Sequence, residues 1–103
     1  MSEREKRDIR KTLQLSKQHR RTHLDITADI LRASVSGIRK TRLMYRCNLN
    51  FLRLEKYLSL LLQKDLLRSV VAKKSFSENL FETTRKGKEF LKTYRSLEVL
   101  LTY

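Results

Sequence analysis

The stretch CNLN at residues 47–50 separates two segments in which apolar residues recur at helical spacing. The first segment covers residues 38–46, and the second runs from residue 50 to about residue 64. Asn50 is a favourable N-cap for the second helix, and Leu49 is expected to fill the angle between the two. The residues expected to face inward are Leu43 and Met44 before the break, and Leu54, Tyr57, Leu58, Leu61 and Leu62 after it. The break therefore predicts two helices that cross steeply, joined by a tight turn.

A further helix is expected before this pair. Thr22 and Asp25 have the spacing of a capping box, so the helix should run from about His23 to Ser36. Gly37 follows at a place where the end of a helix favours a positive φ. The residues expected to face inward from this helix are Ile26, Ile30, Leu31 and Val35.

After Asp65 the spacing changes from helical to strand-like. The strand formers are Leu67, Val70 and Val71, followed by Leu80, Phe81 and Thr83. The basic, polar stretch 73–79 between them predicts the loop of a β-hairpin. Thr84 is a suitable cap for a last helix that ends at about Thr102.

The predicted fold is therefore mainly α with a small β-hairpin. Residues 1–21 have too few apolar side chains for a core face, and they form a basic arm that is either a solvated helix or disordered. Residues 22–83 hold three core helices and the hairpin. Residues 84–103 form the C-terminal helix.

The charge of the chain points to a polyanionic partner. The 103 residues include 24 lysines and arginines against 11 acidic residues, which gives a net charge of +13. The excess is spread along the whole chain, so the folded part is itself basic. Nucleic acid is the commonest partner of such a surface. The alternative is that the charge only keeps the protein soluble.

The sequence lacks the patterns of an enzyme, a metal site or a membrane protein. His19, His23 and Cys47 lack the spacing of metal ligands, and Cys47 is expected to be a small buried residue. No glycine-rich phosphate loop and no acid–base pair is evident. The longest apolar run is Leu60-Leu61-Leu62, and the N-terminus has no secretory signal. We expect a cytoplasmic protein that is not an enzyme and has no cofactor, metal or small-molecule ligand.

A helix-turn-helix followed by a basic hairpin can place its second helix in the major groove of duplex DNA. Leu52 and Lys56 are expected on the outer face of that helix, flanked by Arg53. The alternative for Arg53 and Lys56 is that they are ordinary solvent-exposed charges. The candidate DNA-binding residues on the helix pair and the hairpin are Arg39, Lys40, Thr41, Arg42, Asn48, Asn50, Leu52, Arg53, Lys56, Lys73 and Lys74.

Several stretches together resemble a known family. They are GIRKTRLMYR at 37–46, Asn48-Leu49-Asn50, Tyr57-Leu58, Leu61-Leu62 and TRKGKEFL at 84–91. Over residues 24–103 the chain resembles the small basic winged helix-turn-helix proteins of archaea, which include the chromatin-associated "ten-a" proteins of Sulfolobus and related transcription regulators. The resemblance implies a winged helix that binds duplex DNA, commonly as a dimer through its C-terminal helix. Asp65 departs from the family, which usually has glycine there, and the last helix is short for the long coiled coil of the chromatin-associated members.

The C-terminal helix carries its own pattern. Phe90, Tyr94, Leu97 and Leu101 are spaced 4, 3 and 4 residues apart, which is the alternation of a heptad seam. We predict that this stripe joins two copies of the chain in a homodimer. The alternative is that it packs on the first core helix of its own chain.

Taken together, these patterns predict a dimeric protein that binds duplex DNA, as a transcription regulator or a nucleoid-associated protein. Two alternatives stay open. One is a basic helical RNA-binding protein, although Phe76 is the only aromatic residue expected on the hairpin loop. The other is a winged helix that binds another protein.

Overall fold

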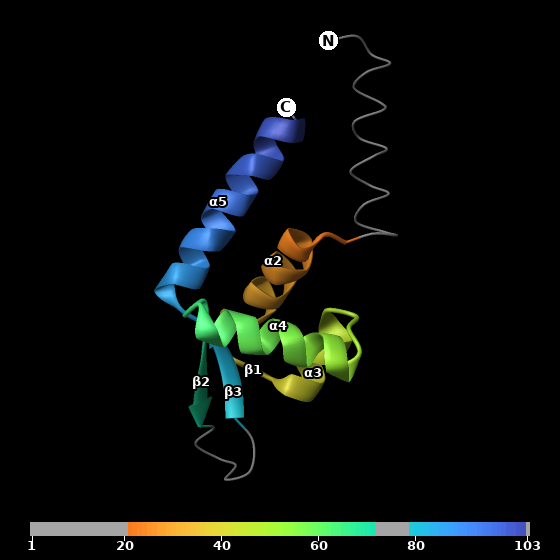
Figure 1. The fold of residues 1–103 in the computed structure, drawn as a ribbon. Coiled ribbons are helices and arrows are strands. Elements are labelled where there is room, and N and C mark those ends of the chain that lie inside the picture. Colours follow the sequence, from red (N-terminus) through yellow and green to blue (C-terminus); the bar gives the residue numbers. More distant parts are fainter. Residues whose placement is uncertain (1–20, 72–78, 103) are drawn as a thin grey trace.

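The computed structural model describes residues 21–71 and 79–102. These residues form a helical body with a small sheet (Figure 1). The elements are α2 (His23–Ala33), β1 (Ile38–Arg39), α3 (Lys40–Arg46), α4 (Phe51–Gln63), β2 (Leu67–Val71), β3 (Asn79–Thr83) and α5 (Arg85–Thr102). The three strands form one antiparallel sheet in the order β1–β3–β2.

The predicted first residue of the second helix was wrong. Ile38 and Arg39 form a short strand that pairs with Phe81 and Leu80 of β3, and α3 begins only at Lys40. The reason is tertiary, because β3 would otherwise leave one edge without a hydrogen-bonded partner. Pairing there also buries the Ile38 side chain, which is 5% exposed. The sheet therefore has a third strand beside the predicted hairpin. The loop with Lys73 and Lys74 lies outside the described residues.

One core joins α2, α3, α4 and the start of β2. The predicted inward residues Ile26, Ile30, Leu31, Leu43, Leu54, Tyr57, Leu58 and Leu61 are all buried in it, with Leu49 and Leu67. Met44 is partly buried against the same cluster. The prediction was wrong for Val35, because α2 ends at Ala33 and leaves Val35 41% exposed. It was also wrong for Leu62, which is 37% exposed and lies about 100° around the helix from Leu61.

The ends of α2 are held by specific hydrogen bonds. The predicted capping box is present, since Thr22 Oγ1 accepts from the amide of Asp25 and the Asp25 carboxylate accepts from the amide of Thr22. At the other end, the Thr83 hydroxyl donates to Leu31 O over 2.6 Å, and the Thr83 amide donates to Ser34 O over 3.0 Å. These bonds fix α2 to β3, the central strand of the sheet.

The C-terminal end of α4 and the N-terminal end of α5 lie close together. Asp65 has a φ of 60°, and the amides of Asp65 and Leu66 donate to Leu62 O and Leu61 O, which closes α4 with a Schellman motif. Glycine, the residue that the resemblance led us to expect at this position, adopts such a left-handed φ most easily. The Thr84 hydroxyl donates to Asp65 O over 2.6 Å and accepts from the amide of Gly87, so one side chain joins the two helices.

Helix α5 runs beside α2 in its first half and extends past it in its second half (Figure 1). The Tyr94 hydroxyl donates to the Asp25 carboxylate, and the Arg32 guanidinium lies 5.7 Å from the centre of the Tyr94 ring. Phe90 is partly buried against the core, whereas Leu97 and Leu101 are 52% and 60% exposed. Tyr94 therefore packs on the first core helix of its own chain, and the stripe beyond it stays exposed.

Candidate nucleic-acid interface

The turn between α3 and α4 is built by its two asparagines. Asn48 has a φ of 53°, a conformation that asparagine tolerates better than most residues. The amides of Asn48 and Leu49 donate to the carbonyls of Tyr45 and Met44, and they end α3 with a Schellman motif. Asn50 Oδ1 accepts from the amide of Arg53 over 2.8 Å and caps α4. Two predicted DNA-binding residues thus have a structural role in positioning α4.

The sequence analysis missed Arg21 as a partner of this turn. Its guanidinium donates to Cys47 O over 2.5 Å and to Asn48 O over 3.0 Å, and it forms an ion pair with Asp29 over 3.2 Å. A cation is favoured there because the carbonyls at the end of a helix carry partial negative charge. Nothing in the sequence marks Arg21 among the many basic residues, because the contact spans 26 positions along the chain.

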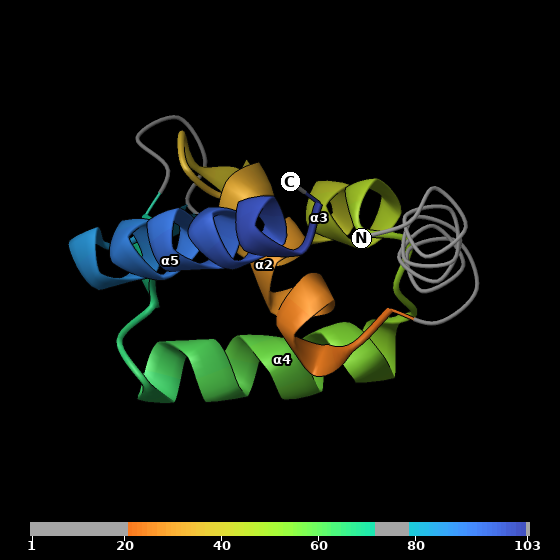
Figure 2. The same cartoon turned by 90° about the horizontal axis from the view of Figure 1, so that it is seen from above.

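The outer face of α4 is open and basic. Leu52 and Lys56 are exposed, as predicted, and so are Arg53, Ser59 and Gln63. Figure 2 shows α4 along one outer edge of the molecule. The exposed fraction of Leu52 reaches 72%, and the neighbouring Phe51 is 54% exposed. The N-terminal turns of α4 therefore present two cations and two large apolar side chains to a partner.

Lys40 is tied to α4. Its ammonium forms an ion pair with Glu55, and it lies 4.5 Å from the centre of the Phe51 ring. Both partners belong to α4, so this flank of α3 faces the second helix of the pair. The Glu55 carboxylate therefore offsets the charge of Lys40, which the sequence analysis places among the candidate DNA-binding residues.

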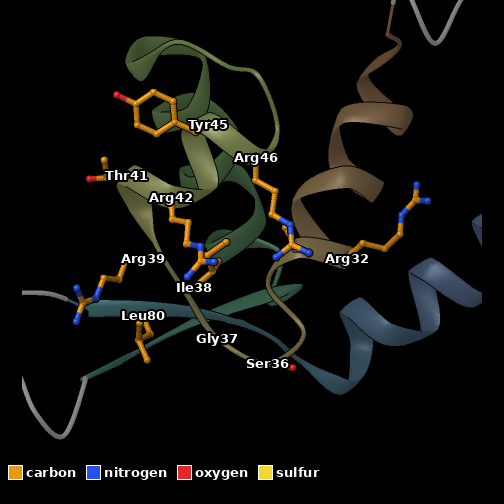
Figure 3. A pocket seen from close by; sticks show the side chains of 11 residues that line it. Arg32, Ser36, Gly37, Ile38, Arg39, Thr41, Arg42, Tyr45, Arg46 and Leu80 are labelled. Atoms are coloured by element: carbon orange, nitrogen blue, oxygen red, sulfur yellow. The ribbon is translucent and has the colours of Figure 1, made fainter.

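The opposite flank of α3 borders an open pocket of about 930 Å³ (Figure 3). It is lined by Arg32, Ala33, Ser36, Gly37, Ile38, Arg39, Thr41, Arg42, Tyr45, Arg46 and Leu80. Figure 3 shows the side chains of Arg42 and Arg46 extending towards one another near Ile38, while Thr41 and Tyr45 extend away from them. The predicted residues Arg39, Thr41 and Arg42 thus come together with residues that the sequence analysis did not select.

Cys47 carries no sign of a reactive thiol. Its side chain is 3% exposed, and burial, together with the charge of Asp29, raises the pKa of the thiol to about 11. The thiol is therefore protonated at neutral pH, and thiols react as thiolates. Across the described residues, no three His, Cys, Asp or Glu side chains come together as metal ligands. None of the helices within the described part is long and apolar enough to cross a membrane.

Solved structures share this arrangement. Sso10a-2, a DNA-binding protein from Sulfolobus solfataricus, superposes with a TM-score of 0.65 and 26% sequence identity, over 78% of this chain and 81% of that one. The PcaV transcriptional regulator from Streptomyces coelicolor gives a TM-score of 0.69 at 16% identity, over 92% of this chain and 73% of its own.

The MepR–DNA complex of S. aureus gives a TM-score of 0.66 at 16% identity, over 92% of this chain and 78% of its own. At such identities the last two show the fold alone. A comparison with curated proteins gave no match. The family model described as winged helix-turn-helix matches residues 20–102. That match spans both helices of the turn, the hairpin strands and α5, and the chain therefore belongs to the winged helix-turn-helix family.

Proposed function

We propose that this protein binds duplex DNA through the outer face of α4, as a transcription regulator or a nucleoid-associated protein. One observation carries the proposal: Arg53 and Lys56 are exposed on a helix that is fixed at both ends and lies at an outer edge of the molecule (Figure 2). The net charge of +13 favours the same partner. A similar DNA-binding protein, Sso10a-2, supports it.

In this proposal α4 lies in the major groove. Arg53 and Lys56 can donate hydrogen bonds to guanine edges, and the exposed Leu52 can pack on a thymine methyl group. Lys73 and Lys74 of the hairpin loop would contact phosphates beside the groove. We also propose that two copies pair through α5, since Leu97, Leu100 and Leu101 are exposed on its second half.

The test is a binding titration on a candidate promoter duplex and on random duplexes at two salt concentrations. Arg53→Ala with Lys56→Ala should weaken binding strongly, and the control Arg85→Ala with Lys88→Ala removes two exposed charges from α5 instead. If the protein reads sequence, Arg53→Ala alone should relax its preference at a cost of about 1–3 kcal/mol. If it reads backbone and shape, all duplexes should be weakened equally.

Equal binding by the α4 variant and the α5 control would contradict the proposal. Structured RNA that competes better than duplex DNA would favour the RNA-binding alternative. Loss of all nucleic-acid binding at moderate salt would favour a protein partner. Lys73→Gln with Lys74→Gln should lower the dependence of log K on log salt by up to about two charges' worth.

A further inference from the structure

Four arginines line the pocket beside α3. They are Arg32, Arg39, Arg42 and Arg46, and none of the other described residues that line the pocket is acidic. Arg32 has a partner, because it forms an ion pair with Asp29 over 3.5 Å. Within residues 21–71 and 79–102, no ion pair is formed by Arg42 or Arg46. The guanidinium groups of Arg42 and Arg46 are therefore directed at a pocket whose lining, among the described residues, contains no carboxylate. The carboxylate of Asp29 belongs to the adjoining pocket, which Arg32 and Arg46 also line.

The pocket is separate from the outer face of α4. Leu43 marks the inward direction of α3, since it is fully buried. At roughly 100° per residue, Lys40 lies about 60° to one side of Leu43, and Arg46 and Arg42 lie about 60° and 100° to the other. Lys40 contacts Glu55 and Phe51 of α4. The arginine flank therefore faces away from α4, towards the end of α2 and β1 (Figure 3).

The lining suits a phosphate group. The guanidinium is a planar fork of N–H donors that matches two oxygens of one phosphate, and it stays charged at any physiological pH. Ile38, Ala33 and Leu80 add apolar surface. A volume of about 930 Å³ has room for a ligand larger than one phosphate ion.

We propose that Arg42 and Arg46 form a second phosphate-binding site on the flank of α3 that faces away from α4. The phosphate belongs either to the backbone of a second stretch of nucleic acid or to a free nucleotide. Both sources present the same chemistry to the arginines. The site does not depend on contact between α4 and DNA, so the two proposals fail or stand separately.

The first experiment uses the full chain, labelled with ¹⁵N, and pyrophosphate as the probe. We expect the amides of residues 36–38 and 42–46 to shift at lower pyrophosphate concentration than those of residues 51–60. Arg42→Gln with Arg46→Gln should weaken this binding about tenfold, because two charge-assisted hydrogen-bonding groups are lost. Arg85→Gln with Lys88→Gln removes the same charge from α5 and should change it less than about twofold.

A further double variant, Arg42→Lys with Arg46→Lys, keeps both positive charges but loses the planar guanidinium groups. It should bind pyrophosphate with intermediate affinity if the site recognises phosphate geometry. All variants should give the ligand-free spectrum of the folded chain outside the changed residues. Shifts spread evenly over the basic residues, or an equal loss in the α5 control, would overturn the site.

The second experiment separates the two sources of phosphate. The protein is bound to an immobilised duplex, and capture of a second, labelled duplex is measured with and without ATP. If the site binds nucleic acid, Arg42→Gln with Arg46→Gln should lower capture of the second duplex, measured per protein molecule held on the first duplex. If the site binds a free nucleotide, ATP should bind to the complex of protein and immobilised duplex. Wild type and the Arg42→Gln/Arg46→Gln variant should then capture the same amount of the second duplex. If the variant captures as much of the second duplex as wild type does, and ATP does not bind the complex, the proposal is overturned.

Discussion

At residue 87 the first turn of α5 passes so close to the end of α4 that only a hydrogen fits. A Cβ on Gly87 would lie 2.3 Å from Leu66 O and 2.5 Å from Thr83 Cγ2. Leu66 O is held in place, because it accepts a hydrogen bond from the amide of Thr84. Since Leu66 O is a backbone atom, it cannot move aside as easily as the end of a flexible side chain could.

We therefore expect Gly87→Ala to lower the free energy of unfolding by about 1–3 kcal/mol, as overpacking usually does. Alanine would otherwise stabilise a helical position by about 1 kcal/mol, so the sign of the change reports the clash. Urea unfolding followed by circular dichroism measures it. Ser96→Ala, at an exposed position of α5, is the control and should be neutral or stabilising. A stabilised Gly87→Ala variant would show that the two helices can separate at little cost.

Cys47 gives the stability a dependence on alkaline pH. Burial raises the pKa of its thiol in the folded state from 9.0 to about 11. Below pH 9 the thiol is protonated in both states, and its contribution to stability is fully present. Between pH 9 and about 11 the unfolded state loses the proton and the folded state keeps it, so the free energy of unfolding falls as pH rises.

The measurement compares wild type with Cys47→Ala in urea at several pH values. At pH 7 the variant should be less stable, because alanine leaves a small cavity in the core. Above pH 9 the wild type should lose stability faster than the variant, and the gap between them should narrow. Parallel curves from pH 7 to 11 would mean that the buried thiol titrates as it does in the unfolded chain.

At the scale of elements, the position of α4 depends on the turn before it, and the turn depends on Arg21. That side chain, 21% exposed, donates to two carbonyls at the end of α3. Arg21→Gln removes the charge and should lower the free energy of unfolding by about 1.5–3 kcal/mol, the range for hydrogen bonds to charged groups. Arg21→Lys keeps the charge without the fork and should cost less.

Hydrogen exchange locates this effect. In Arg21→Gln the amides of Asn48 and Leu49 should exchange faster than in wild type, while the amides within β3 should change only with global stability. Equal acceleration at every amide would mean that Arg21 stabilises the fold as a whole and has no special link to the turn.

At the scale of the molecule, the exposed second half of α5 leads to the prediction of a dimer. Leu97, Leu100 and Leu101 are 52%, 74% and 60% exposed, and pairing with the same helix of a second copy would bury them. Sedimentation at micromolar concentration should then give twice the mass of the chain. Leu97→Glu with Leu101→Glu should give a folded monomer that binds DNA more weakly.

Val71→Glu is the matched control for this pair. Val71 is 71% exposed and lies on β2. Its substitution by glutamate therefore also replaces an exposed apolar side chain with a charged one. The control should sediment as a dimer. Wild-type protein that remains monomeric at high concentration would rule out the pairing, and the exposed leucines would then need another partner.

The sequence alone determined the elements whose causes are local. The CNLN turn, the capping box at Thr22 and the inward stripe of α4 follow from backbone preferences and helical spacing. The structure confirms them, except that Leu62 of the stripe is exposed. These causes act within a few residues, so a single sequence carries them in full. The basic character of the outer face of α4 could be predicted for the same reason.

Only the tertiary structure decided the contacts between segments far apart in the chain. Residues 38–39 became a strand because the free edge of β3 lay beside them. Lys40, which was predicted to lie on the DNA-binding surface, pairs with Glu55 of α4, and Arg42 and Arg46 line the pocket beside β1. Helical spacing tells which side of α3 a residue occupies, but what lies on that side depends on how α2, α4 and the sheet pack around it.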